Sequence, residues 1–185
     1  MDKGNEIYRR FLQGDTDALG ELVALYNERL VLFLFGFVKD FSLAEDLAAD
    51  TFLHLLVRKP AFRQEQAFRT WLFRIAKNKA IDLLRKKKRF PELSLDDEGV
   101  SLAHLELPET LLCQEERNCL LYKAMQTLPQ TYSTVLQLLY FEEMSYKQIG
   151  KIMHMHEKQV KNAAYRARLA LKEACIKEGI ENAFE

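Results

Sequence analysis

The chain has 185 residues with 27 basic and 27 acidic side chains, and 48% of its residues are hydrophobic. This length allows one large domain or two small ones, each with a packed core. Only seven glycines and four prolines, with few β-branched runs, predict an almost entirely helical chain. The polar N-terminus and the short longest apolar run, residues 30–38, argue against a secretory signal and a spanning helix. We therefore expect a cytoplasmic protein whose three cysteines are reduced.

Charge is segregated along the chain although the net charge is zero. Residues 68–89 hold nine Lys or Arg and one acid, whereas residues 90–116 hold eight acids and no Lys or Arg. Residues 145–172 are again basic, with seven Lys or Arg and one acid. Two basic segments separated by an acidic one predict two nucleic-acid contacts. The predicted organisation is all-α, with two small helical domains and an acidic linker between them: 1–90, 91–110 and 111–185.

The N-terminal part of the sequence predicts two helices that contribute to a core. A short helix over 5–13 places Ile7, Phe11 and Leu12 on one side. After a break at Gly14 and Asp15, a longer helix carries an apolar stripe with further apolar residues beside it. We expect this second helix to be buried on more than one side, as the central helix of the first domain.

A third helix is predicted to begin at a capping box, the sequence SLAE at 42–45, and to end at Lys59 and Pro60. Its expected core face includes Leu55 and Leu56. The opposite side combines acids with exposed aliphatic residues, which is typical of a partner-binding face but also of an ordinary solvated one. The members of this face are Asp46, Asp50, Leu53 and Val57.

Residues 68–89 predict a fourth helix with an apolar stripe and a second face that mixes rings with cations. Cations neutralise phosphates and rings stack on unpaired bases, so this face suits a single-stranded polyanion. An amphipathic core helix ending in a solvated basic run is the alternative. The residues that share the second face are Trp71, Arg74, Asn78, Ile81 and Arg85.

The C-terminal part predicts a helix-turn-helix. A helix over 111–128 ends at Pro129, and a second capping box, SYKQ at 145–148, begins a short helix. A three-residue break, 154–156, separates it from a last, basic helix that begins at Glu157. Such a helix fits the major groove of DNA; a plain helical hairpin with a solvated basic face is the alternative. Its outward residues are Lys158, Lys161, Asn162, Tyr165, Arg166 and Arg168.

Other chemistry has little support in the sequence. His154 and His156 have no cysteine or acid cluster near them in the sequence, so we interpret them as a solvated pair and expect no metal. The chain has no glycine-rich phosphate loop and no nucleophile motif. We therefore expect neither a cofactor nor an enzymatic activity.

Three segments, in this order, resemble bacterial RNA polymerase sigma factors of the extracytoplasmic-function group. AEDLAADTFLHLL resembles the segment that binds core polymerase, and FRTWLFRIAKNKAIDLLRKKKR resembles the segment that melts the promoter. LPQTYSTVLQLLYFEEMSYKQIGKIM followed by KQVKNAAYRARLALK resembles the C-terminal helix-turn-helix. The resemblance covers nearly the whole chain, and it implies a dissociable sigma subunit that recognises the minus-35 and minus-10 elements.

The resemblance also implies partners and residue roles. The first domain would bind the clamp helices of the largest polymerase subunit through Asp46, Asp50, Leu53 and Val57. The second domain would sit on the flap of the second-largest subunit, and an anti-sigma factor is a further expected partner. Asn78 and the loop before Phe68 would hold a flipped base. The residues expected at the minus-10 element are Arg69, Trp71, Arg74, Lys77, Asn78 and Arg85; those expected at the minus-35 element are Lys158, Lys161, Asn162, Tyr165, Arg166 and Arg168.

The chain departs from the family pattern at three places. Ala49 and Asp50 stand where the family usually has Gln and Glu, and His154 and His156 stand where it often has Gly and Ser. Ala163 stands where Arg is common. Two other functions remain open from the residues alone: a stand-alone helix-turn-helix regulator, and a helical adaptor that binds only proteins.

Overall fold

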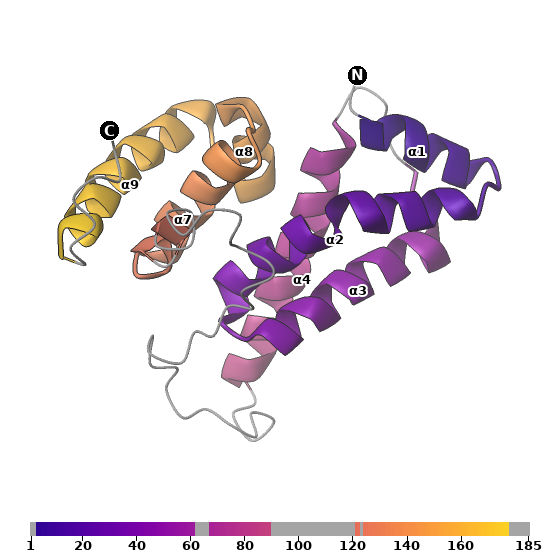
Figure 1. The fold of residues 1–185 in the computed structure, drawn as a ribbon, viewed down its shortest axis with the longest axis horizontal. Coiled ribbons are helices and arrows are strands. Elements are labelled where there is room, and N and C mark those ends of the chain that lie inside the picture. Colours follow the sequence, from indigo (N-terminus) through magenta and orange to yellow (C-terminus); the bar gives the residue numbers. More distant parts are fainter. Residues whose placement is uncertain (1–2, 62–66, 90–120, 123, 178–185) are drawn as a thin grey trace. The chain divides into compact units, whose positions relative to one another are not determined.

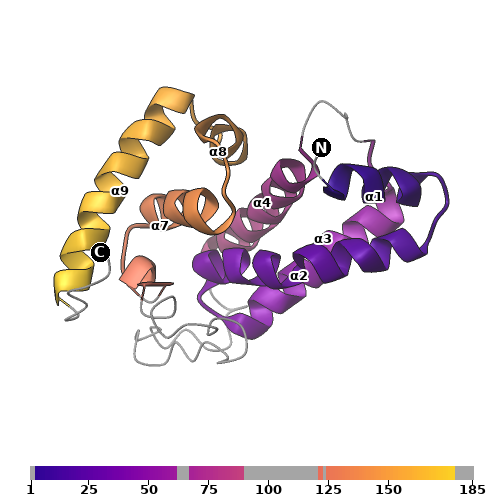
Figure 2. The same cartoon turned by 45° about the horizontal axis from the view of Figure 1, so that its top comes forward.

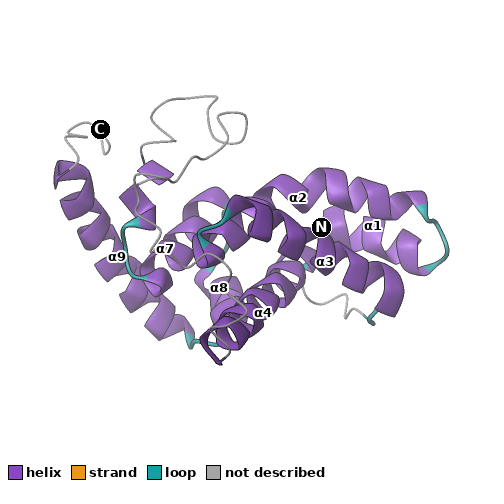
Figure 3. Ribbon diagram, turned by 90° about the horizontal axis from the view of Figure 1, so that it is seen from below, coloured by secondary structure: helices purple, strands orange, loops and turns teal. Residues whose placement is uncertain are grey.

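The computed structural model describes residues 3–61, 67–89, 121–122 and 124–177, and the part it describes contains helices and loops without strands (Figure 3). The all-α class is therefore confirmed. The chain divides into two compact units, Met1–Asp97 and Glu98–Glu185 (Figure 1). The predicted linker 91–110 and the first residues of the predicted helix 111–128 lie outside the described residues. Within the described residues, no helix is long and apolar enough to cross a bilayer.

The described part of the first unit contains four helices: α1 (Lys3–Leu12), α2 (Asp17–Val38), α3 (Phe41–Arg58) and α4 (Phe68–Arg89). Helix α2 contacts the other three, and it runs beside α3 in Figure 2. Leu30 and Leu34 on its predicted stripe are buried, and so are Val31 and Phe35 beside that stripe. The prediction of a central helix buried on more than one side is confirmed.

Helix α3 begins earlier than the sequence predicted. Asp40 has extended backbone angles and its carboxylate accepts a hydrogen bond of 2.9 Å from the Leu43 amide. Ser42 therefore lies inside the first turn, and the predicted capping box at 42–45 is wrong because an acid two residues earlier takes the cap. The C-terminal boundary is confirmed, since the helix ends at Arg58 and Lys59 adopts the left-handed conformation.

Two leucines predicted to face the core are exposed. Leu12 is the last residue of α1, and Leu56 lies at the edge of the buried face of α3, beside Leu53. Helix positions at the edge of a stripe are covered only if a neighbour reaches them. Leu55 is fully buried, whereas Leu56 is 44% exposed.

Helix α1 caps the start of α4. The side-chain oxygen of Asn5 accepts a hydrogen bond of 2.6 Å from the backbone amide of Phe68, the first residue of α4. The first amides of a helix have no partner within it, so this contact satisfies one of them from a distant segment. The approach requires glycine at position 4, because a Cβ atom there would lie 2.5 Å from the Tyr26 hydroxyl and 2.7 Å from Cδ1 of Phe68.

Aromatic rings join α1 to the first turn of α4. The Tyr8 ring lies 5.1 Å from that of Phe68 and 5.4 Å from that of Trp71, measured between centroids. The Tyr8 hydroxyl donates a hydrogen bond of 2.8 Å to the carbonyl of Pro60. Burial raises the pKa of Tyr8 to about 12, so the hydroxyl keeps the proton it donates. Helix α4 is therefore held at its N-terminal end.

The second unit contains α7 (Gln130–Leu136), the π-helical segment η3 (Gln137–Phe141), α8 (Tyr146–Met153) and α9 (Glu157–Lys177). Residues 121–122 and 124–126 are helical and precede α7. Helix α9 packs against both α7 and α8. Its inner side joins a buried cluster consisting of Ala124, Met125, Leu136, Ala167, Leu171 and Cys175.

The turn between α8 and α9 forms without the glycine and serine common in the family. The capping box at the start of α8 is confirmed: Ser145 Oγ accepts from the Gln148 amide, and Gln148 Oε1 accepts from the Ser145 amide. His154 takes the left-handed conformation, with φ of 56°, and ends the helix. The His156 amide then donates a hydrogen bond of 2.8 Å to Oε1 of Gln159, in the first turn of α9. The predicted helix, break and helix are confirmed.

Replacing the capping residue of α4 should destabilise the first unit. We expect Asn5→Ala to lower its free energy of unfolding by about 1 kcal/mol, because the Phe68 amide loses its acceptor. Asn5→Asp keeps an acceptor at a helix N-terminus and should retain most of the stability. Trp71 is the only tryptophan in the chain, so urea unfolding followed by tryptophan fluorescence reports on the first unit of the intact protein. Equal stability of all three proteins would show that the cap contributes nothing.

Candidate nucleic-acid and polymerase interface

Helix α9 has an exposed polar face and a buried apolar face, and small side chains make up much of the buried one. Val160 and the alanines at 163, 164 and 167 are buried, which lets the helix lie close to α8 and α7. Ala163, where the family often has arginine, lies at the edge of this buried face. The six residues predicted to face outward are all exposed: Lys158, Lys161, Asn162, Tyr165, Arg166 and Arg168.

The exposed residues of α9 differ in what holds them. Arg166 and Lys158 make no side-chain hydrogen bond or ion pair with the described residues, whereas Lys161 pairs with Glu157 at 3.2 Å. The Arg168 guanidinium donates hydrogen bonds to two tyrosine hydroxyls, 2.8 Å to Tyr140 and 3.2 Å to Tyr146. These bonds raise the pKa of Arg168. Neither tyrosine could be found from the sequence, because no periodicity shows contacts between residues 22 or 28 positions apart.

Helix α4 exposes only part of the face that its sequence predicts. Asn78 and Arg85 are exposed, and Arg69 and Arg74 are half-buried. Trp71 is only 9% exposed, so its predicted place on the open face is wrong. Trp71, Asn78 and Arg85 do share one phase of the helix, being seven residues apart. However, α1 and the rings of Tyr8 and Phe68 cover the first turn and bury the tryptophan.

Lys77 is a second correction on α4. It is 6% exposed, although we expected it among the cations that meet DNA. Burial lowers the pKa of the Lys77 ammonium, and the nearby Arg85 lowers it further. Lys77 lies about 100° around the helix from the exposed residue Asn78, on the side that packs against the other helices. The available cations are instead Arg85 and the exposed members of the last turn, Lys86, Lys88 and Arg89.

Helix α3 presents the expected acids and aliphatic residues. Asp46 and Asp50 are exposed, and Leu53 and Val57 are 52% and 68% exposed. Leu56, which we expected inside, is 44% exposed and extends this surface. We call Leu53, Leu56 and Val57 the α3 ridge. Asp50 is paired with Lys79 of α4, which ties one end of the face to the basic helix.

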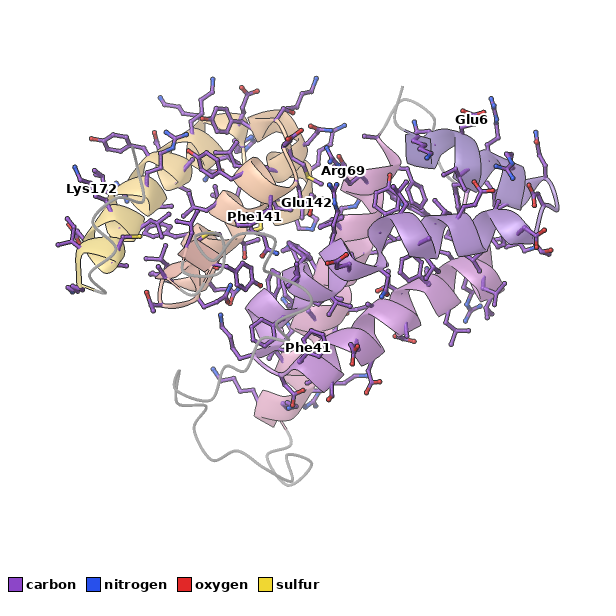
Figure 4. The ribbon with its side chains drawn as sticks, viewed as in Figure 1. Glu6, Phe41, Arg69, Phe141, Glu142 and Lys172 are labelled. Carbon is purple, nitrogen blue, oxygen red and sulfur yellow. The ribbon has the colours of Figure 1, made fainter. Side chains whose placement is uncertain are left out.

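The second unit also contains an apolar groove of about 450 Å³. Phe141 and Lys172, labelled in Figure 4, are on its two sides, one from η3 and the other from α9. Apolar residues form most of the lining, and two cations lie at the α9 side. The lining residues are Leu121, Met125, Tyr140, Phe141, Arg168, Leu169, Leu171 and Lys172. Among the described residues, no group of three or more His, Cys, Asp or Glu could hold a metal ion.

Comparisons with known proteins agree with this geometry. The model of Sigma-70 region 2 matches residues 22–90, and that of Sigma-70 region 4 matches residues 120–171. The extracytoplasmic-function sigma factor SigW of Bacillus subtilis is 32% identical over 170 residues, which cover 86% of this chain and 90% of that protein. The chain belongs to the extracytoplasmic-function group of the sigma-70 family. It is a sigma subunit that directs promoter-specific initiation of transcription.

Other similar proteins also match most of the chain. The sigma-H factor of Pseudomonas aeruginosa is 29% identical and covers 94% of both chains. Among solved structures, the sigma factor RpoE of Bartonella quintana, in complex with the anti-sigma factor NepR, has a TM-score of 0.65 at 20% identity. The match covers 85% of this chain and 96% of the RpoE chain. CnrH, in complex with the cytosolic domain of CnrY, has a TM-score of 0.63 at 23% identity. The match covers 91% of this chain and 94% of the CnrH chain. Both show the fold of this sigma factor.

The α3 ridge generates a prediction about core polymerase. We expect Leu53→Ser combined with Val57→Ser to weaken the binding of core RNA polymerase at least about tenfold, because burying an aliphatic side chain contributes about 1.5–3 kcal/mol when it is complete. Both side chains are exposed, so the free energy of unfolding should change by no more than about 0.5 kcal/mol each. Competition for core enzyme against the parent protein measures the effect. Leu25→Ser, an equally simple change at an exposed leucine of α2, is the control, and unchanged competition by the double variant would remove the ridge from the interface.

Proposed function

We propose that the two units of this sigma factor divide the promoter between them. The second unit reads the minus-35 duplex with the exposed face of α9, and the first unit holds the opened minus-10 strand with the exposed part of α4. The observation that carries the proposal is the two-faced character of α9: four neighbouring polar residues face solvent while the valine and alanines behind them are buried. Those four residues are Lys161, Asn162, Tyr165 and Arg166.

At the minus-35 element, the chemistry of α9 suits direct reading of base edges. Arginine and lysine reach the acceptors of guanine in the major groove, and asparagine pairs with adenine. Lys158, one turn before these residues, suits a phosphate. Arg168 is held by two tyrosines and has a different role, which is treated below.

At the minus-10 element, Asn78 and the cations around it are the proposed contacts. Arg69, Arg74 and Arg85 would neutralise phosphates of the separated strand, and the Asn78 amide would hydrogen-bond an unpaired base. The loop before Phe68, which the resemblance assigns to the flipped base, lies outside the described residues for the most part. Trp71 supports the helix from inside and takes no part in stacking.

Protein partners would use other surfaces. The α3 ridge with Asp46 and Asp50 would bind the clamp helices of the largest polymerase subunit. The apolar groove beside α9 would receive the flap of the second-largest subunit. An anti-sigma factor would compete for one or both surfaces. With these partners the protein would act in the cytoplasm, as an initiation factor without catalysis of its own.

Base reading and phosphate contact predict different behaviour for two residues of α9. Arg166→Ala should lower the affinity of the holoenzyme for its preferred minus-35 sequence by about 1–3 kcal/mol and relax the preference at one or two base pairs. Lys158→Ala should weaken binding to all sequences alike and reduce the salt slope by about one unit. Holoenzyme binding to a randomised minus-35 library at several salt concentrations measures both. A uniform loss for Arg166→Ala would mean that this residue only positions the helix.

The proposed role of α4 concerns strand opening. Asn78→Ala should leave the closed complex nearly intact and reduce opening, because its partner is an unpaired base that appears only after melting. Thymines that react with permanganate report opening, and a gel shift at low temperature reports the closed complex. Asn27→Ala, which removes an exposed amide from α2, is the matched control. Equal losses of closed and open complexes would contradict the proposal.

A further inference from the structure

Tyr146 connects two cations of α9 that lie two turns apart. It is the first residue of α8, and its hydroxyl accepts a hydrogen bond of 3.2 Å from Nη2 of Arg168. The ammonium of Lys161 lies over its ring, 5.8 Å from the centroid. Lys161 and Arg168 are seven residues apart, so both project toward the same side of α9. One tyrosine therefore contacts both of them, one with its hydroxyl and the other with its ring.

A second tyrosine strengthens this arrangement from another element. Tyr140, in η3, accepts a hydrogen bond of 2.8 Å from Nε of Arg168. The guanidinium thus joins η3, α8 and α9 through two acceptors. A planar guanidinium with donors in fixed directions suits such bridging, whereas an ammonium does not fix two partners in the same plane. The two bonds place Arg168 where it orients the Tyr146 ring.

We propose that Tyr146 is a positioning residue for minus-35 recognition, through which Arg168 orients Lys161. This inference rests on the proposed reading of the minus-35 element by Lys161. A free lysine side chain loses considerable rotamer freedom when it binds, and a lysine already held against a ring loses less. The cation–π contact also limits where the ammonium can reach. Arg168 then contributes to affinity through its hydrogen bonds to the tyrosines and makes no phosphate contact.

The expected effects are moderate because the contacts are partly exposed to water. Tyr140 and Arg168 are exposed and Tyr146 is half-buried. Charge-assisted hydrogen bonds and cation–π contacts at such positions are each worth a few-fold in an equilibrium constant. Tyr146→Phe, which keeps the ring and loses the hydroxyl, should lower the affinity for the preferred minus-35 sequence about threefold. Tyr146→Leu, which loses both, should lower it about tenfold and relax preference at the same base pair as Lys161→Ala.

Arg168→Ala tests the route through the tyrosine. We expect it to lower the affinity about as much as Tyr146→Phe, with the salt slope unchanged because no phosphate contact is lost. The variant that combines Arg168→Ala with Tyr146→Phe should lose little more affinity than either single variant, since both changes break the same hydrogen bond. The measurement is holoenzyme affinity on a randomised minus-35 library at several salt concentrations, together with thermal unfolding of each free variant. Tyr132→Phe is the matched control, because it removes a hydroxyl from a ring that packs against the buried cluster of the same unit.

Two results would overturn the inference. If Arg168→Ala lowers the salt slope by about one unit while Tyr146→Phe changes nothing, Arg168 binds a phosphate directly. If the Tyr146 variants unfold at lower temperature but bind and discriminate like the parent, the tyrosine only stabilises the unit. Failure of the proposed function is distinguishable: Lys161→Ala and Arg166→Ala would then leave the minus-35 preference intact, whatever the tyrosine variants do.

Discussion

Tyr8 packs against both Phe68 and Trp71 while Asn5 caps the first amide of α4, and these contacts decide which part of the basic helix meets solvent. They cover the first turn of α4 with α1, whereas one side of its later turns stays exposed. The exposed part begins near Asn78 and continues into the basic last turn. A helix anchored at one end can present cations at the other without losing its place in the core, which is what strand capture requires.

The same constraint operates on α9 through small side chains. Alanines at 163, 164 and 167 let the helix approach α7 and α8, and its long polar residues lie on the remaining, exposed side. In both units, function is available only on the surface that a neighbouring helix leaves open. The tyrosines at 140 and 146 add a further restriction at the border between the packed and open faces. Both accept hydrogen bonds from Arg168, and the ring of Tyr146 also contacts Lys161.

The sequence could predict what depends on local periodicity. The stripe of α2, the end of α3 at Lys59 and the capping box at Ser145 follow from residues within a few turns of one another, and the structure confirms them. It could not predict contacts between distant segments. The sequence correctly placed Trp71 and Asn78 on one side of α4. It could not show that Tyr8, 63 positions away from Trp71, covers the tryptophan. The burial of Lys77 and the pairing of Asp50 with Lys79 also depend on segments that are distant in sequence, so the sequence did not predict them.

The central claim is that α9 reads duplex while the exposed part of α4 holds a separated strand. Photo-cross-linking from a reactive amino acid incorporated at position 78 or at position 162 of the holoenzyme tests it most directly. We expect position 162 to cross-link to the minus-35 duplex in both closed and open complexes. Position 78 should cross-link to the non-template minus-10 strand in the open complex alone. Equal cross-linking from position 78 before and after opening, or none from position 162 upstream, would contradict the account.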